Sequence, residues 1–162
     1  MKTMTSTLKD NPVPDLTEPA AQAPTYWIRG IPAPLIETFW HYAAPFVKRA
    51  LDHANGEFDH TDFRGLCQNR DMQLWIVARP DRVVGAITTE IVVYPHRKHL
   101  RVVTLAGAEF EKWVDIANVT MDEFAKLHAC NAVECFTRRG FVKKLEPFAY
   151  KMRHCVLIKD LT

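Results

Sequence analysis

The sequence predicts a mixed α/β domain (α+β by some conventions) with a mostly antiparallel sheet and helices on both faces. Apolar residues recur at helical spacing up to about residue 68, then alternate at a period of two, and after residue 108 the two patterns follow each other in turn. The expected order is ααβββαβαβ after an extended arm. With 162 residues, 48% of them hydrophobic, the chain should build one core.

The first 25 residues differ in composition from the rest of the chain. They contain Pro12, Pro14, Pro19 and Pro24, no glycine and few apolar side chains, which favours an extended path. Ordering such a segment costs about 1–2 kcal/mol per residue, so it needs a surface to lie against. We therefore expect residues 1–25 to bind other protein subunits, in a homo-oligomer or a larger assembly, and the domain to span residues 26–162.

Two helices are expected at the start of the domain. Residues 34–54 place apolar side chains on one stripe, and Asn55-Gly56 is a typical helix stop. Asp59 or Thr61 then provides an N-cap for a short second helix that reaches Cys67. The stripe of the first helix consists of Leu35, Phe39, Tyr42, Phe46 and Ala50.

Three strands follow as an antiparallel meander. Residues 73–78 and 83–94 are rich in Trp, Ile, Val and Thr, and the turn 80–82 joins them. A second reversal at 96–99 leads into the third strand, residues 100–105.

A long helix is expected over residues 108–129, where apolar side chains return to a single helical face. Thr120 and Glu123 have the spacing of a capping box, which predicts a break or kink near Asn118.

The last three predicted elements alternate between strand and helix. Residues 131–137 form a short strand, residues 141–148 a short helix, and residues 152–161 a final strand.

The charge and hydropathy of the chain argue against a nucleic-acid-binding protein and against a membrane protein. The 21 Lys and Arg residues nearly match the 19 Asp and Glu residues, for a net charge of +2, which does not favour a nucleic-acid partner. No apolar run approaches the roughly 20 residues needed to cross a bilayer, and the N-terminus lacks the apolar core of a secretory signal. We expect no membrane association.

The four cysteines are expected to be free thiols of a reducing cytosol, because a chain of this size folds without disulfides. His128, Cys130 and Cys135 are three ligand types close in sequence. Their spacing matches no standard zinc motif and no fourth ligand is evident, so we predict no metal site.

Several short motifs, in order, resemble the GNAT superfamily of N-acetyltransferases, and in particular GNAT-like proteins encoded by tailed bacteriophages and prophages. The resemblance covers residues 26–161, and Tyr26–Arg29 could supply the first strand of that fold. It implies a GNAT-like sheet, with an acetyltransferase activity that uses acetyl-CoA. The motifs are Asp71–Val77, Gly85–Ile91, Tyr94-Pro95, Leu105–Gly107, Arg138–Phe141 and Val156–Leu161.

The resemblance also locates the cofactor loop. Active members hold the pyrophosphate of acetyl-CoA on backbone N–H groups of a glycine-rich loop before the long helix. Here the matching residues are Leu105, Ala106, Gly107 and Ala108, with one glycine. Glu109 and Glu111 follow in the first helical turn, where a carboxylate would compete with an anionic ligand.

Two positions bear on acid–base chemistry. Leu145 falls where the resemblance places a tyrosine that protonates the departing thiolate, and leucine has no proton to give. Glu90, on the central strand, matches the carboxylate that deprotonates the amine in many members. The alternative for Glu90 is an ordinary surface or salt-bridge residue of a strand.

Two functions remain open at this point. The first, favoured by the altered loop and by Leu145, is a catalytically degenerate GNAT-fold protein of a phage or prophage, a structural or interaction component of the virion, with no cofactor. The alternative is an acetyl-CoA-dependent N-acetyltransferase acting on an unidentified amine through Glu90. The expected location is the virion or the cytoplasm of a bacterial host.

Overall fold

The computed structural model describes residues 25–54 and 56–161. The predicted arm, residues 1–25, lies outside the described residues except for Thr25. The expected boundary at residue 26 and the binding role of the arm are therefore untested predictions.

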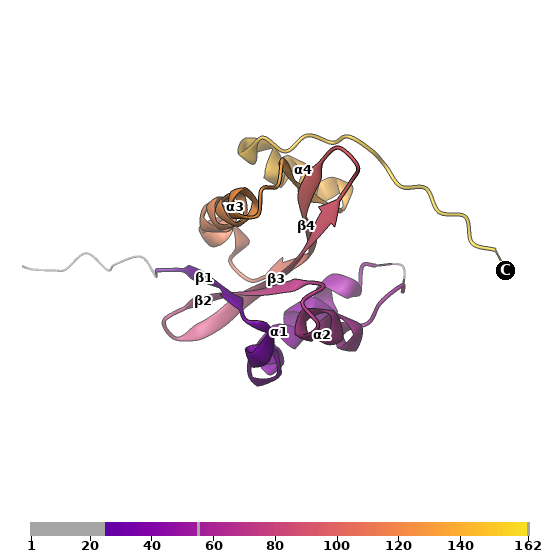
Figure 1. Ribbon diagram of the computed structural model, residues 1–162. Coiled ribbons are helices and arrows are strands. Elements are labelled where there is room, and N and C mark those ends of the chain that lie inside the picture. The colour runs from indigo at the N-terminus through magenta and orange to yellow at the C-terminus, as the bar shows by residue number, and fades with distance from the viewer. Residues whose placement is uncertain (1–24, 55, 162) are drawn as a thin grey trace, which may run out of the picture.

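A five-stranded sheet in the order β1-β2-β3-β4-β5 forms the centre of the domain (Figure 1). The first four strands pair in antiparallel fashion, and β5 lies parallel to β4. Short reversals join β2, β3 and β4 as the meander predicts, whereas α1 and α2 lie between β1 and β2. Tyr26–Arg29, the suggested first strand, overlaps the observed β1. The strands are β1 (Trp27–Ile31), β2 (Gln73–Arg79), β3 (Arg82–Val93), β4 (Lys98–Gly107) and β5 (Ala132–Cys135).

Helices cover both faces of this sheet, as Figure 1 shows, with α1 and α2 on one side and α3 and α4 on the other. Because side chains alternate along a strand, Leu74 packs under α1 and α2 while Trp75 packs under α3. The predicted fold class is confirmed. The helices are α1 (Ile36–Leu51), α2 (His60–Gln68), α3 (Phe110–Leu127) and α4 (Arg139–Leu145), with single 3₁₀ turns at Ala33–Leu35 and Glu146–Phe148.

The start of α2 shows how local sequence fixes an element. The Asp59 side chain accepts hydrogen bonds from the N–H groups of Thr61 and Asp62, at 2.7 and 3.0 Å, and the Asp62 carboxylate accepts one from the Asp59 N–H at 2.8 Å. Of the two predicted caps, Asp59 is the one used.

Within residues 25–54 and 56–161, no helix has the length and apolar character that a bilayer crossing requires. All four cysteines are free: Cys67 is buried, Cys130 and Cys135 are partly buried, and Cys155 is exposed.

The predicted break in the long helix is wrong. Residues Phe110–Leu127 form one continuous helix, and the Thr120 hydroxyl donates to the carbonyl of Ile116, one turn earlier, at 2.7 Å. A threonine that bonds back to residue i−4 sits inside a helix rather than capping one.

The predicted final strand is also wrong. Residues 152–161 form no strand and run away from the domain, at the yellow end of Figure 1, with Leu157 91% exposed. The β-branched and apolar pattern of Val156 to Ile158 supplies strand propensity alone. Because a strand is stabilised by its pairing and packing, propensity without a paired neighbour does not produce one.

Two glycines determine how closely α3 approaches the sheet. Gly85 on β3 and Gly107 on β4 are register partners, and the buried Trp113 ring of α3 lies directly over them. A Cβ on Gly107 would lie 2.7 Å from Cζ2 of Trp113 and 2.9 Å from the Val84 carbonyl oxygen. The Trp113 indole N–H then donates to the Ala108 carbonyl at 2.7 Å, which fixes the ring.

Substituting Gly107 by alanine should therefore destabilise the protein by about 1–3 kcal/mol through overpacking. The matched control is Gly65→Ala in α2, where an added Cβ meets nothing within 4 Å and alanine has the higher helix propensity. Urea denaturation of both variants tests this. Equal stabilities for the two variants would contradict the packing role of Gly107.

Candidate functional site

The sheet opens where β4 and β5 part. β4 pairs with β3 over most of its length, from Lys98 to Gly107, but it pairs with β5 only over His99–Val102. After Cys135 the chain leaves β5 and turns into α4. A cavity of about 730 Å³ occupies this divergence.

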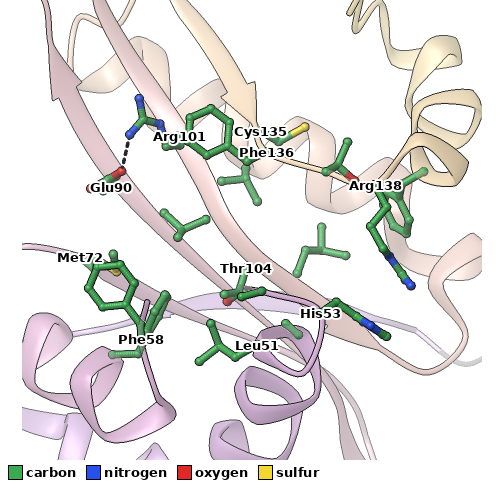
Figure 2. A pocket seen from close by; sticks show the side chains of 18 of the residues that line it. Leu51, His53, Phe58, Met72, Glu90, Arg101, Thr104, Cys135, Phe136 and Arg138 are labelled. Carbon is green, nitrogen blue, oxygen red and sulfur yellow. Dashed lines mark hydrogen bonds and ion pairs between the residues drawn. The ribbon is translucent and has the colours of Figure 1, made fainter. Parts of the chain in front are cut away.

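Two groups of side chains line the cavity (Figure 2). One group comes from the end of α1, the α1–α2 connection, α2 and the residue before β2, and includes Leu51, Phe58 and Met72. The other comes from β4 and the segment after β5, and includes Thr104 and Arg138. The cavity therefore extends from the end of α1 and the α1–α2 connection to β4 and residues 136–138.

Glu90, the candidate base, lies in the cavity wall. The two residues before it are committed to the core: Thr88 bonds Thr104 at 2.7 Å, and Thr89 lies between the Trp75 indole and the Gln73 amide. The Glu90 carboxylate instead points into the cavity, where Oε1 accepts a hydrogen bond from Nη1 of Arg101 at 2.8 Å.

Arg101 is the centre of a charged network across three strands. Its Nε donates to Glu134 of β5 at 2.7 Å, and its Nη2 donates to the Tyr94 hydroxyl at 2.9 Å. His99 Nδ1 lies 2.8 Å from the other Glu134 oxygen. Partial burial would raise the pKa of Glu134, but the hydrogen bonds from His99 and Arg101 outweigh it and hold the pKa below its usual value.

The four residues predicted to hold a cofactor are only partly brought to the cavity. Leu105 lines it, whereas Ala106 and Gly107 pair with β3. The Ala108 N–H donates to Val84 at 2.8 Å. The single glycine of this loop thus serves helix packing, and the Ala108 amide that a phosphate would need is already bonded.

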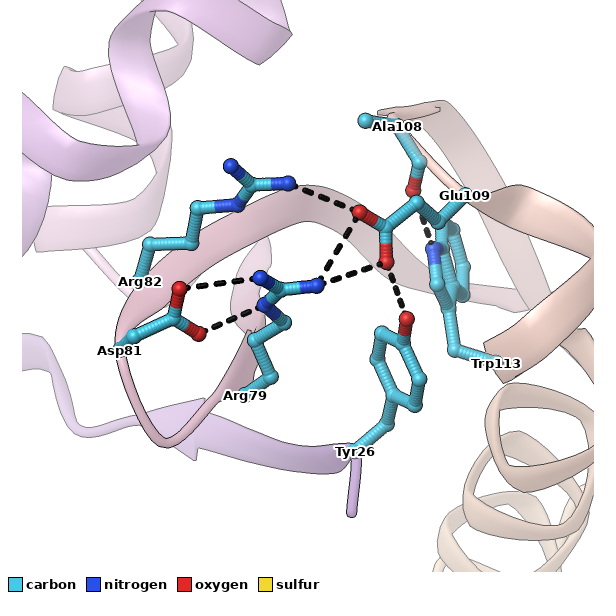
Figure 3. A network of polar contacts seen from close by, with 7 residues as sticks. All are labelled: Tyr26, Arg79, Asp81, Arg82, Ala108, Glu109 and Trp113. Carbon is cyan, nitrogen blue, oxygen red and sulfur yellow. Dashed lines mark hydrogen bonds and ion pairs between the residues drawn. The ribbon is translucent and has the colours of Figure 1, made fainter. Parts of the chain in front are cut away.

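The sequence predicts that Glu109 competes with an anionic ligand at the start of the long helix, but in the structure Glu109 faces another part of the protein. It adopts a left-handed conformation (φ 58°) that directs its carboxylate toward the β2–β3 hairpin (Figure 3). There it accepts hydrogen bonds from the Tyr26 hydroxyl, from Arg79 and, at 2.8 Å, from Arg82. The Tyr26 hydrogen bond first, and then Arg82, lower the pKa of Glu109. Its charge is therefore compensated within the protein.

Cations lie near the start of α3. Arg49, from the last turn of α1, donates to the Gly107 carbonyl at 3.0 Å, and Lys144 of α4 pairs with Glu111 at 2.7 Å. Neither Arg49 nor Arg101 was assigned to the site from the sequence. The missed arginines lie beside the site only through the packing of α1 on β4 and the register of β3 with β4.

In the described ranges, no three His, Cys, Asp or Glu side chains converge as metal ligands. What the cavity offers instead is a carboxylate held by an arginine, apolar walls and a cationic rim. Such an arrangement can take a proton from a bound group and accommodate a slender ligand with an anionic end.

Comparison with known proteins identifies the fold. No family model and no curated sequence matches the chain. Among similar solved structures is a ribosomal-protein-alanine N-acetyltransferase from Brucella melitensis, with a TM-score of 0.61 and 13% identity over 85% of this chain and 100% of that one. A GNAT family acetyltransferase from Staphylococcus aureus matches with a TM-score of 0.56 and 13% identity over 84% and 98%.

The aminoglycoside N-acetyltransferase AAC(6')-Iy, in complex with CoA, matches with a TM-score of 0.62 and 11% identity over 88% of this chain and 98% of that one. At these identities the comparisons show that the chain has the GNAT fold. The expectation of no cofactor is contradicted, because a protein of this fold is in complex with CoA.

Removing the charge of Arg101 should leave Glu90 without its partner on β4 and Glu134 with only His99 and Tyr94. Arg101→Met is expected to cost about 1–3 kcal/mol of unfolding free energy, since partly buried carboxylates lose their partner. Adding Glu134→Gln should recover part of this loss, giving a coupling of about 0.5–3 kcal/mol in a double-mutant cycle. If urea denaturation shows that the two substitutions change the free energy of unfolding additively, Arg101 and Glu134 are not coupled and the network is contradicted.

Glu109 should make the protein acid-sensitive. Because its pKa is lowered on folding, its contribution to stability is present above the unfolded-state value of about 4.3 and is lost as pH falls through the folded-state value. The free energy of unfolding, measured by urea denaturation at pH values from about 6 to 3, should therefore fall more steeply with decreasing pH for the wild type than for Glu109→Gln. The exposed Glu123→Gln serves as the control, and equal slopes for the wild type and Glu109→Gln would refute the role of Glu109.

Proposed function

We propose that the protein is an acetyl-CoA-dependent N-acetyltransferase that acts on an amine in the cavity where β4 and β5 diverge. One observation carries the proposal: a fixed carboxylate, Glu90, lies in the wall of that cavity, in a chain that has the GNAT fold. A bound amine can give a proton to this carboxylate within the same enclosure.

The cavity residues fit the cofactor in two respects. Beyond Val102, no strand among the described residues pairs with the outer edge of β4, so its backbone groups are available to the amides of a pantetheine arm. Arg138 lines the cavity, and Arg49 and Lys144 lie near the start of α3. These three cations could contact the phosphates of the cofactor. The loop departs from the family pattern at Gly107, and we assign the phosphate contacts to side chains rather than to a glycine-rich loop.

The chain's own residues divide the chemistry as follows. Glu90 takes the proton from the amine through Oε2, and Arg101 holds the other oxygen in place. When bound, acetyl-CoA supplies the acetyl group and a thiol whose pKa, about 8.5 for an ordinary thiol, allows it to leave as a thiolate. Leu145 lines the cavity and has no proton to give, so we assign no general acid.

A second candidate is a structural or interaction component, such as a phage virion protein. It is supported by one observation, the use of Gly107 and Ala108 for packing and sheet contacts in place of a phosphate loop. Acetyl transfer separates the two candidates.

Purified protein should release CoA from acetyl-CoA in the presence of a suitable amine. Glu90→Gln keeps the shape of the side chain but removes the base, so the rate should fall by about 10²–10⁴-fold. The matched control is Glu123→Gln, an exposed position of α3 away from the cavity, which should leave the rate unchanged.

Cofactor binding is measured separately, so that a missing amine substrate does not obscure the result. Acetyl-CoA at 100 times its dissociation constant should stabilise the wild type and Glu90→Gln by about 2.7 kcal/mol each. Failure of acetyl-CoA to raise the Tm of the wild type would overturn the proposal and favour the second candidate.

A further inference from the structure

We propose that the amine substrate is a monoamine carried on an apolar, aromatic-sized body, and not a polycation. This inference rests on the proposed function and deepens it. It comes from the side of the cavity formed by the end of α1, the α1–α2 connection, α2 and Met72 (Figure 2).

This side of the cavity is largely apolar, although His53 and Glu57 also line it. Leu51 ends α1, Phe63 is a buried residue of α2, and Met72 precedes β2, where it is 8% exposed. Phe58, on the α1–α2 connection, packs edge-on against Phe63 with ring centroids 5.8 Å apart. Its own side chain is 49% exposed, so one face of the ring is available to a ligand. An aromatic or aliphatic group would bury this surface favourably.

The charges do not favour a ligand with three or more ammonium groups. Glu57 and Glu90 are the two carboxylates among the cavity-lining residues, and Arg101 occupies one oxygen of Glu90. Arg101 and Arg138 line the same cavity and repel further positive charge. Several ammonium groups would each need a carboxylate, and the described walls do not supply them.

Position favours the same substrate. Glu90 lies on β3, above the ring of Phe58 and the side chain of Met72 in Figure 2. Phe58 and Met72 line the same cavity as Glu90, so a primary amine that directs its nitrogen to the carboxylate finds apolar side chains for its body within that cavity.

The experiment measures amine binding directly, by titration calorimetry of the full chain with and without CoA. The probes are 2-phenylethylamine, hexylamine, spermidine and kanamycin. We expect the two monoamines to bind at least tenfold more tightly than the two polycations. Phe58→Ala should weaken the binding of 2-phenylethylamine by roughly tenfold, and Phe58→Leu should retain most of the wild-type affinity for this amine.

The matched control is Tyr42→Ala. Tyr42 is an aromatic residue of α1 that is 48% exposed, like Phe58, but it does not line the cavity. Its loss should leave monoamine affinity unchanged, while a circular-dichroism melt of each variant reports on folding. A loss of affinity in Tyr42→Ala equal to that in Phe58→Ala would overturn the assignment of Phe58.

The outcomes separate this inference from the proposed function. Polycations that bind as tightly as the monoamines, or no binding by either class, would overturn the inference. Acetylation of spermidine or kanamycin alone would keep the proposed function and overturn the inference. A monoamine that binds but is not acetylated in the presence of acetyl-CoA would keep the inference and count against the proposed function.

Discussion

The geometry of the site depends on where the pairing of β4 with β5 stops. Arg101 and Glu134 are register partners one residue before the last paired rung, and Arg101 also faces Glu90 across β3 and β4. One guanidinium thus ties three strands together at the point beyond which two of them part. Because five N–H donors in a rigid plane can serve several acceptors at once, arginine suits this position better than lysine. The cavity begins directly beyond this tie.

The other end of β4 is fixed by a different constraint. Gly85 and Gly107 leave room for Trp113, and the ring brings the start of α3 close to the sheet. Glu109 then secures that start to the β2–β3 hairpin through Arg79 and Arg82. The first contact uses Gly107, which the resemblance assigns to the cofactor loop, and the second uses Glu109, which follows that loop. Packing and ion pairing therefore take precedence here over a backbone anion site.

The fold was predictable because apolar periodicity distinguishes helices from strands. The buried face of α1 was predicted wrongly: of the expected stripe, Leu35 and Tyr42 are 45% and 48% exposed. The residues that pack on the sheet are instead Ile36, Trp40, Ala43 and Val47. Part of the site was also predicted, because the resemblance places Glu90 on the central strand. Its pairing with Arg101 was not predicted, since the expected reversal at 96–99 implies a register that differs from the observed one. The cavity was not predictable, because it depends on where pairing ends. The orientation of Glu109 depends on its positive φ and on partners 27 and 30 residues away. The final strand failed because local propensity does not report whether a paired neighbour exists.

The charge of the network links the proposed chemistry to the proposed substrate. Two carboxylates, Glu90 and Glu134, share one guanidinium, so these three side chains together carry one net negative charge beside the cavity. One negative charge attracts one ammonium group and places it beside the carboxylate that would deprotonate it. Further ammonium groups gain nothing there and approach Arg101 and Arg138 instead. The ion pair that fixes the position of Glu90 therefore also limits the charge that the cavity can accept.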